Sequence, residues 1–208
     1  MARYTGPVCR LCRRLGDKLY LKGEKCFTPK CAFERRPYPP GQRFARRRKV
    51  SDRGLQLREK QRGRAVYGIL ETQFHRYYEE AVQRHGVTGE NLLRTLEMRL
   101  DNVVFRLGLA DSRAQARQVV LHGHIAVNAR KSGIPSHVLK PNDAVSLTSR
   151  GQRSEYFAVV RESIASKAIP SWLSLDPTEM TGRVLAPPEV EEMGLKFNPA
   201  TIVEYYSR

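Results

Sequence analysis

The sequence predicts an α+β protein: a mainly helical first domain with a basic N-terminal arm, followed by a small domain of two helices and short strands. Three observations lead to this fold class. Four cysteines and most of the excess positive charge lie in the first third of the chain. The middle repeats apolar residues every three or four positions, as helices do, and two later segments alternate as strands do. At 208 residues the chain is long enough for two domains with their own cores.

The positive charge of the chain is concentrated at its start. The whole sequence holds 37 Lys and Arg against 21 Asp and Glu, and residues 1–64 hold 20 against 5. So large an excess of positive charge is either neutralised by a polyanion or destabilises the compact state through repulsion between the cations. Nucleic acid is therefore the favoured partner, and its binding should weaken with salt as counterions are released. A solvated basic tail without a partner is the alternative reading.

Composition also excludes several classes of protein. A hydrophobic content of 40% excludes a wholly disordered chain. No apolar run approaches the ~18 residues of a membrane span, and the first residues contain no apolar stretch typical of a secretory signal. We therefore expect a soluble, cytoplasmic protein whose thiols stay reduced.

The four cysteines form two closely spaced pairs, Cys9 with Cys12 and Cys26 with Cys31. Two such pairs joined by a loop can bring four thiolates to one tetrahedral zinc ion, and the neighbouring Lys and Arg favour the thiolate form. The same ligands suit an iron–sulfur cluster, and four free thiols are a third possibility. A zinc site closed by four cysteines has no open coordination position, so the metal is expected to be structural.

A basic segment follows the cysteines. Residues 35–42 are too rich in proline for a helix or a central strand and should run extended. Residues 43–49 then place five cations within seven positions. This stretch is the best candidate for contact with phosphates, and Tyr38 and Phe44 are available to stack on bases.

Helices are predicted next. Ser51 is expected to cap a helix on which Arg58 and Arg62 share one face. An amphipathic pattern then begins, with apolar residues at helical spacing that are more typical of a core than of a cofactor site. These residues are Val66, Leu70, Phe74, Tyr77 and Ala81.

Residues 99–150 predict two helices followed by strands. Gly108 is expected to end the first helix, and Ser112 with Gln115 forms a capping box that starts the second. Arg113 and Arg117 lie four positions apart on one face of that second helix. Two short strands are expected at 124–128 and 144–147. Helices, short strands and nearby cations together describe a compact RNA-reading module.

The C-terminal part carries fewer signals. Residues 153–167 predict a helix that buries Phe157, Val160 and Ile164. Residues 201–206 alternate enough to predict a closing strand.

Motifs along most of the chain resemble those of the ribosomal protein S-four family. The family's small RNA-binding domain is similar to residues 99–104, 112–118, 122–125 and 127–128. The rest of the family pattern is similar to the four-cysteine knuckle and to residues 37–42, 57–61, 67–68, 88–93 and 202–208. The resemblance covers essentially the full length and its motifs are specific.

This resemblance implies a domain organisation. Residues 1–45 would form a four-cysteine zinc knuckle and basic arm. Residues 46–97 together with 170–208 would form a discontinuous helical domain, and residues 98–160 would form the inserted RNA-binding domain.

The resemblance also implies a function, that of a structural constituent of the small ribosomal subunit. Such a protein is a primary binder of 16S rRNA in its 5′ domain, nucleates subunit assembly, and influences messenger access and translational accuracy. The implied partners are 16S rRNA, neighbouring small-subunit proteins and messenger RNA near its entrance channel, with no membrane and no small-molecule substrate. The residues expected to contact RNA are Arg3, Arg10, Arg13, Arg14, Tyr38, Arg43, Arg46, Arg47, Arg48, Lys49, Arg58, Lys60, Arg62, Arg64, Arg113, Arg117, His122, His124, Asn128, Arg130 and Lys131.

The chain departs from the family pattern in two places. The family usually has Asn-Gly after the first strand, whereas this chain has Asn128 and Ala129, which predicts a shifted or strained turn. The His-Gly expected after Gly41 and Gln42 is also missing. Many relatives lack the cysteines, so the metal is expected to support the arm's fold rather than the family's function.

Two other functions compete with the ribosomal one. The same small domain occurs in pseudouridine synthases, whose catalytic Asp lies in an Arg-Leu-Asp tripeptide like the one that ends at Asp101. Here that residue lies inside the binding module, where it is expected to orient a helix or pair with an arginine, and we expect no enzyme. A free-standing RNA-binding assembly or stress factor is the other alternative, although it would need neither the basic arm nor the C-terminal return.

Overall fold

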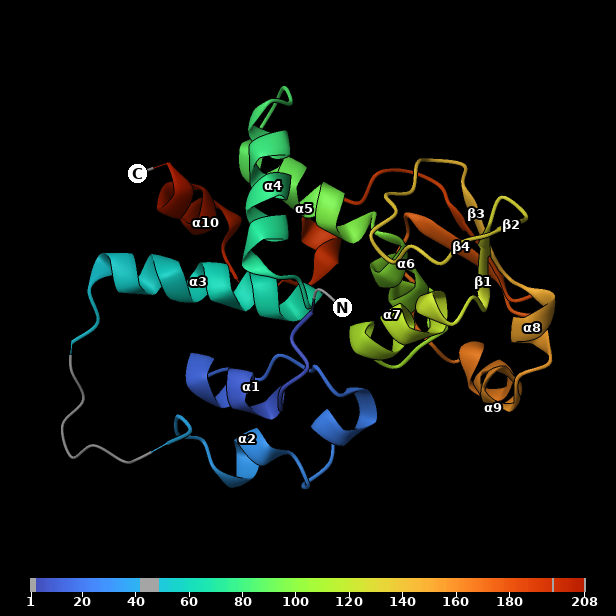
Figure 1. The fold of residues 1–208 in the computed structure, drawn as a ribbon, viewed down its shortest axis with the longest axis horizontal. Coiled ribbons are helices and arrows are strands. Elements are labelled where there is room, and N and C mark those ends of the chain that lie inside the picture. The colour runs from blue at the N-terminus through green and yellow to red at the C-terminus, as the bar shows by residue number, and fades with distance from the viewer. Residues whose placement is uncertain (1–2, 42–48, 196, 208) are drawn as a thin grey trace. The chain divides into compact units, whose positions relative to one another are not determined.

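The computed structural model describes residues 3–41, 49–195 and 197–207. The chain divides into two compact units, one of Met1–Leu93 with Leu195–Arg208 and one of Arg94–Gly194. Figure 1 shows the first unit as helices alone and the second as helices around a sheet. The fold is therefore a mixture of helices and one small antiparallel sheet, consistent with the α+β class predicted from the sequence.

The first unit is built from short helices in the cysteine arm and longer ones behind it. Its elements are α1 (Cys9–Leu15), η1 (Gly23–Cys26), α2 (Ala32–Arg35), α3 (Asp52–Tyr67), α4 (Glu71–Val82), the start of α5 (Thr88–Glu97) and α10 (Pro199–Tyr206). As predicted, the Ser51 hydroxyl caps α3 by accepting from the backbone N–H of Gly54.

The apolar stripe predicted from Val66 is divided between two helices. Gly68 takes a left-handed conformation with φ +64° and ends α3, so Val66 and Leu70 lie outside α4. Phe74 and the two apolar residues that follow it in the stripe are buried, as predicted.

The prediction of a strand at residues 201–206 is wrong, because these residues belong to helix α10. The Asn198 side chain accepts from the backbone N–H of Ala200, and Pro199 occupies the first turn, where its missing N–H costs nothing. Figure 1 shows α10 beside α3. A side chain at Gly63 would meet Phe197 at 3.2 Å, so the glycine permits this close packing.

The second unit encloses one hydrophobic core between its helices and an antiparallel sheet of order β2-β1-β3-β5-β4. Ile125 lies opposite Leu147, and both are buried in that core. The helix predicted at 153–167 is present as α9, with its three predicted apolar residues buried. The elements are α6 (Leu100–Arg106), α7 (Arg113–Leu121), β1 (Ile125–Val127), β2 (Arg130–Lys131), β3 (Ala144–Leu147), α8 (Ser149–Gln152), α9 (Glu155–Ile164), β4 (Leu173–Asp176), β5 (Thr181–Val184) and η2 (Glu191–Met193).

The division into units differs from the boundaries drawn on the sequence. Those boundaries placed residues 170–208 with the first domain, whereas only Leu195–Arg208 lies in the first unit. The reason is strand pairing: β5 pairs with β3 and β4 pairs with β5, so residues 173–184 complete the sheet of the second unit. No helix in the described part of the chain is long and apolar enough to cross a membrane.

The turn after β1 contains the strain that the sequence predicted. Asn128 and Ala129 have φ of +50° and +64°, a left-handed pair that suits Asn followed by Gly. We expect Ala129→Gly to raise the free energy of unfolding by about 1 kcal/mol, because glycine adopts this conformation without the Cβ clash. Urea denaturation followed by circular dichroism measures the change. Ala158→Gly, on the exposed side of α9, is the control and should destabilise by about 1 kcal/mol; equal shifts for both variants would contradict the prediction.

Candidate nucleic-acid interface

The four cysteines line one cavity in the first unit, although they come from three separate elements. Cys9 and Cys12 lie one turn apart on α1, Cys26 ends η1, and Cys31 is the N-cap of α2. Three of the four are buried, and Cys9 is partly so. The fold therefore brings together all four residues that their spacing singled out. We call this the cysteine cavity.

The thiols of the cysteine cavity influence one another. Burial raises the pKa of Cys12 most, a hydrogen bond from the Leu19 backbone opposes this, and the other three cysteines raise the pKa further. The backbone N–H of Lys22 donates to the Cys26 Sγ at 3.3 Å. The described residues contain no group of three or more His, Cys, Asp or Glu side chains that could hold a metal ion. The four cysteines thus line one cavity without forming a metal-binding group there.

Arg13 connects helix α1 to the segment that follows α2, where Tyr38 lies. The Arg13 Nε donates to the backbone carbonyls of Arg36 at 3.1 Å and Tyr38 at 2.9 Å. Its guanidinium also lies 5.0 Å from the centre of the Tyr38 ring. The contacts assign both side chains a structural task in the arm, whereas Arg10 and Arg14 are exposed on α1.

The cations of α3 differ in what they can reach. Lys60, expected to contact RNA, is only 4% exposed, and its ammonium pairs with the Glu71 carboxylate. Although burial raises the pKa of Glu71, the hydrogen bonds from Lys60 and Tyr206 hold it below its usual range. Lys60 is therefore committed to the interior of the unit.

The other predicted cations of this helix are divided between ion pairs and solvent. Arg62 pairs with Glu59 and lies near Asp17, and the Arg64 guanidinium lies 3.6 Å from the Glu71 carboxylate. Arg58 is exposed. Periodicity correctly placed Arg58 and Arg62 on one helix, but it carried no information on which of them has an acidic neighbour.

The two arginines predicted on α7 face the acidic and amide groups of α6. Arg113 Nε donates to the Asn102 side chain at 2.7 Å, and an Arg117 guanidinium nitrogen donates to Asp101 at 3.1 Å. Asp101 also binds Arg99 at 2.8 Å and is 5% exposed. This carboxylate pairs with arginines, as expected from the sequence, and it does not resemble the accessible acid of a catalytic site.

Glu97 is a buried centre of this network that the sequence reasoning missed. Its side chain is fully buried and accepts two hydrogen bonds from Arg106, at 2.8 and 2.9 Å. The Asn102 amide adds a third at 2.6 Å. The sequence contains a weak signal for this burial, because Glu97 stands between two apolar residues, Leu96 and Met98.

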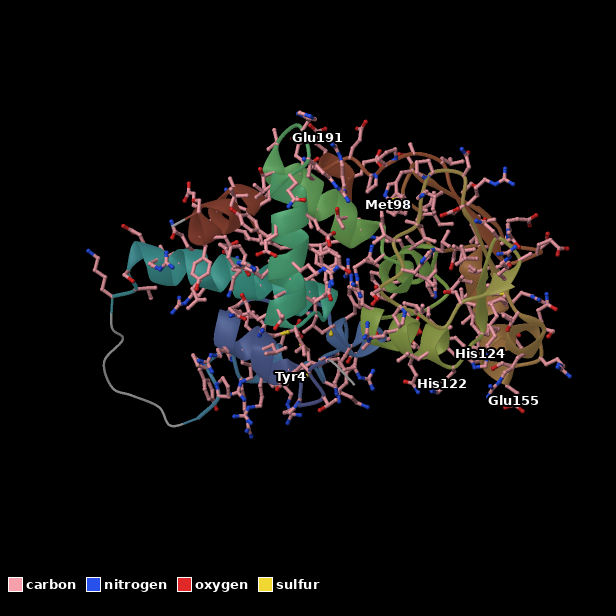
Figure 2. The ribbon with its side chains drawn as sticks, turned by 45° about the horizontal axis from the view of Figure 1, so that its top comes forward. Tyr4, Met98, His122, His124, Glu155 and Glu191 are labelled. Carbon is pink, nitrogen blue, oxygen red and sulfur yellow. The ribbon has the colours of Figure 1, made fainter. Side chains whose placement is uncertain are left out.

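Two histidines mark the surface where α7 passes into β1, and Figure 2 shows their side chains close together. Their ring centres lie 6.1 Å apart; His122 is exposed, and His124 also lies against Phe157. Burial, then the positive charges of Arg150 and His122, lower the pKa of His124. His124 therefore meets a ligand near neutral pH mainly as an uncharged ring.

This environment of His124 predicts a pH effect on stability. Because its pKa is lower in the folded than in the unfolded chain, protonation favours unfolding, and stability should fall as the pH drops below about 6.5. The His124 ring resonances should titrate below that value in an NMR series. His124→Gln should remove this part of the pH dependence, whereas exposed His85 provides a control for which His85→Gln should leave it unchanged. A His124 midpoint at or above 6.5 would show the assignment to be incorrect.

The residues predicted to contact RNA at the β1–β2 turn differ in the contacts they make within the protein. Asn128 is engaged, since its amide donates to Asp143 at 2.8 Å and its side-chain oxygen accepts from the Ala144 N–H at 2.9 Å. Arg130 and Lys131 form β2 and are exposed. Sequence reasoning missed exposed Arg150, because only the fold brings it next to His124.

The predicted contacts thus separate into three groups and one further residue, Arg3. The first group makes the contacts within the protein described above: Arg13, Tyr38, Lys60, Arg62, Arg64, Arg113, Arg117, His124 and Asn128. Arg43, Arg46, Arg47 and Arg48 lie outside the described residues. Arg3 is half-buried. Apart from Asn128, the predicted residues that lie at the surface with exposed side chains are Arg10, Arg14, Lys49, Arg58, His122, Arg130 and Lys131. We call this last group the exposed cationic set.

Comparison with known proteins gives matches along the full chain. Residues 3–97 match the family described as ribosomal protein S4/S9 N-terminal domain, and residues 98–145 match the S4 domain. The chain is 55% identical over 208 residues to the small ribosomal subunit protein uS4 of Heliobacterium modesticaldum, and 52% identical over 208 residues to that of Pelotomaculum thermopropionicum. It is 55% identical over 211 residues to that of Dictyoglomus turgidum. Each match covers 100% of both chains.

Proposed function

Because the chain belongs to the uS4 family of small ribosomal subunit proteins, we propose that it is a structural constituent of the bacterial small subunit that binds 16S rRNA. The family is one of ribosomal structural proteins and not a class of enzymes. Its place of action is accordingly the ribosome in the cytoplasm, with rRNA and neighbouring ribosomal proteins as partners.

The observation that carries the RNA-binding role is the exposed cationic set. Its members extend from folded elements, since Arg14 lies on α1, Arg58 on α3 and Lys131 on β2. Cations held on a folded scaffold recognise the spacing of phosphates, whereas cations on a solvated tail only neutralise them. We propose the 5′ domain of 16S rRNA as the target, bound early enough to nucleate assembly of the subunit.

Two partly buried arginines support this role indirectly. Arg113 and Arg117 tie α7 to α6, and α7 leads directly into β1 through His122. These contacts engage both guanidinium groups within the protein. They also hold α7 in place, and with it the exposed residues that follow this helix.

The cysteine cavity is proposed to hold a structural zinc ion. Four thiols around one space in a reducing compartment fit the four-cysteine donor set that zinc prefers, and an iron–sulfur cluster is the less favoured occupant. Cys9, Cys12, Cys26 and Cys31 would be the ligands. A bound ion would fix α1, η1 and α2 relative to one another, and thereby position the cations of the arm.

The basic segment ahead of α3 is proposed to lie near messenger RNA. Lys49 is exposed three positions before the start of this helix, and residues 43–48 contribute four more arginines to the sequence there. So dense a cluster of cations suits a single strand that passes without sequence-specific reading. Its position near the messenger entrance channel, with an influence on translational accuracy, forms part of this proposal.

Filter binding tests the proposed target. The full chain should bind the 5′ domain of 16S rRNA tightly in the presence of competitor tRNA, with affinity that falls steeply as salt rises. Lys131→Ala and Arg58→Ala should each weaken binding and reduce the salt slope by about 1. Arg76→Ala is a matched control, since Arg76 is exposed on α4 but pairs with Glu80 and lies outside the exposed cationic set.

The outcome distinguishes the proposal from its main alternative. Equal, weak binding to rRNA and tRNA would contradict a role as an rRNA binder and favour a free-standing RNA-binding factor. Co-sedimentation gives an independent comparison, because a ribosomal constituent remains stoichiometric with the small subunit whereas a factor dissociates in high salt.

A further inference from the structure

The cysteine arm carries a pair of stacked aromatic rings at its surface, Tyr20 and Phe27. The ring centres of Tyr20 and Phe27 are 4.9 Å apart, and the planes differ by 28°. Phe27 is 73% exposed and Tyr20 36% exposed. One face of Phe27 meets Tyr20, so the opposite face is open to solvent. A single exposed aromatic residue is ordinary, but two rings stacked at the surface form an apolar plate of defined orientation. We call this pair the aromatic platform.

The chain holds the aromatic platform in place from both sides. Tyr20 directly follows buried Leu19, and Phe27 directly follows buried Cys26. Tyr20 also has φ +52°, a left-handed conformation that is uncommon for a bulky residue. Strained backbone of this kind persists where the surrounding structure enforces it, and it recurs at sites that bind ligands.

The surroundings of the aromatic platform are cationic. Residues 18–36 contain six Lys and Arg against two Glu, a net charge of +4. Lys22, Lys25 and Lys30 are exposed in the same loop and short helix that carry the rings, and the Lys18 ammonium lies 5.3 Å from the centre of the Tyr20 ring.

This combination selects one class of partner. An apolar protein surface placed on Phe27 would also remove the neighbouring ammonium groups from water without compensation. A nucleobase, by contrast, offers a flat π-face for the ring and brings a phosphate for each cation nearby. Since a base inside a duplex already stacks on both of its neighbours, the base that binds must be unpaired.

We propose that the aromatic platform stacks an unpaired nucleobase of RNA on the open face of Phe27, with the exposed lysines of this loop contacting the adjoining phosphates. This inference rests on the proposed function and deepens it. It assigns to the cysteine arm a site for a single-stranded or bulged nucleotide, in addition to general neutralisation of charge.

Substitutions at position 27 test the stacking directly. Phe27→Ala should weaken binding of the full chain to the 5′ domain of 16S rRNA by about five- to 150-fold, the effect of losing one base–aromatic stack. Phe27→Tyr keeps the ring and should bind as the parent chain does. Phe27→Leu keeps apolar area without a π-face and should behave like the alanine variant. Because Phe27 is 73% exposed, none of these changes should disturb folding, which circular dichroism checks.

Ultraviolet crosslinking supplies a readout of contact that does not depend on affinity. Irradiation of the unaltered chain with the same RNA should place a nucleotide on the tryptic peptide of residues 26–30, which holds Phe27, or on residues 19–22, which hold Tyr20. The RNA should be digested before mass spectrometry, so that the adduct identifies one nucleotide.

The outcomes separate this inference from the proposed function. If the parent chain prefers rRNA over tRNA while Phe27→Ala binds unchanged and no adduct forms on either peptide, the aromatic platform is not a base site and the proposed function stands. Full affinity of Phe27→Leu would also overturn it, because apolar area alone would then suffice. If Phe27→Ala binds rRNA normally but fails to join subunits that contain neighbouring proteins, the platform is a protein contact. Failure of the parent chain to prefer rRNA overturns both.

Discussion

Glu97→Gln is expected to lower the free energy of unfolding of the chain by about 3 to 5 kcal/mol, the cost typical of removing one partner from a buried ion pair. The carboxylate is fully buried and accepts two hydrogen bonds from Arg106 as well as one from the Asn102 amide. A neutral amide of the same shape cannot balance the guanidinium charge, and its NH2 group would oppose the donors that face it.

Urea denaturation of the full chain measures this loss. Glu162→Gln on the exposed side of α9 is the matched control, since it removes the same charge from the same unit and should change stability by less than about 0.5 kcal/mol. A double-mutant cycle with Arg106→Gln should show strong coupling, because the second substitution removes a charge that the first has left uncompensated. Equal midpoints for Glu97→Gln and Glu162→Gln would contradict the role assigned to the network.

The local features of the fold were predictable because their causes lie within a few residues. The Ser51 hydroxyl bonds to a backbone group only three positions away, and the same holds for Ser112 and the N–H of Gln115. Both caps were read correctly from sequence. The left-handed turn at Asn128 and Ala129 was also recognisable, since it depends on two adjacent residues and their conformational preferences.

Features that depend on distant partners were not predictable in the same way. Residues 201–206 alternate like a strand, but capping by Asn198 and packing of α10 on α3 decide for a helix. Residues 173–184 gave no sign of which domain they complete, because β5 pairs with residues of β3 that lie 37 and 39 positions earlier, and β4 joins the sheet only through β5. Tertiary contacts outweigh local preference at both places.

The same distinction applies to the candidate site. The four cysteines line one cavity, as their spacing favours, but the described residues contain no group of three or more His, Cys, Asp or Glu that could hold a metal ion, and the predicted metal stays a prediction. Counting cations, however, treated Arg58 and Lys60 alike, although one is exposed and the other is buried against Glu71. A cationic side chain is available to a ligand where the fold places no acidic side chain beside it. The position of the acidic side chain depends on residues far apart along the chain. The rule also explains why Glu97 was missed: its apolar neighbours favour burial, but its partner Arg106 lies nine positions away along the chain.

Cys26→Ala is expected to have the second large effect, a loss of the proposed zinc ion together with the ordered structure of the arm. Structural zinc sites bind with apparent free energies of about 10 to 16 kcal/mol, and much of that energy folds the surrounding chain. Metal analysis of the purified full chain should therefore give one zinc for the parent and none for the variant. Limited proteolysis should cut the arm of the variant first, and affinity for rRNA should fall with it.

Treatment with a chelator should reproduce the effect of Cys26→Ala in the parent chain, and added zinc should reverse it only there. This reversal is the control, because it separates loss of metal from damage done by the substitution. Visible absorbance that disappears on reduction or chelation would instead assign an iron–sulfur cluster to the same four thiols. Four titratable thiols, no bound metal and an arm resistant to proteolysis would contradict the proposal, since packing around Cys12 and Leu19 would then hold the arm alone. Under this proposal the arm's cations and its aromatic platform depend on the bound metal, because Arg10, Arg14 and both rings lie on the helix and loops that connect the four cysteines.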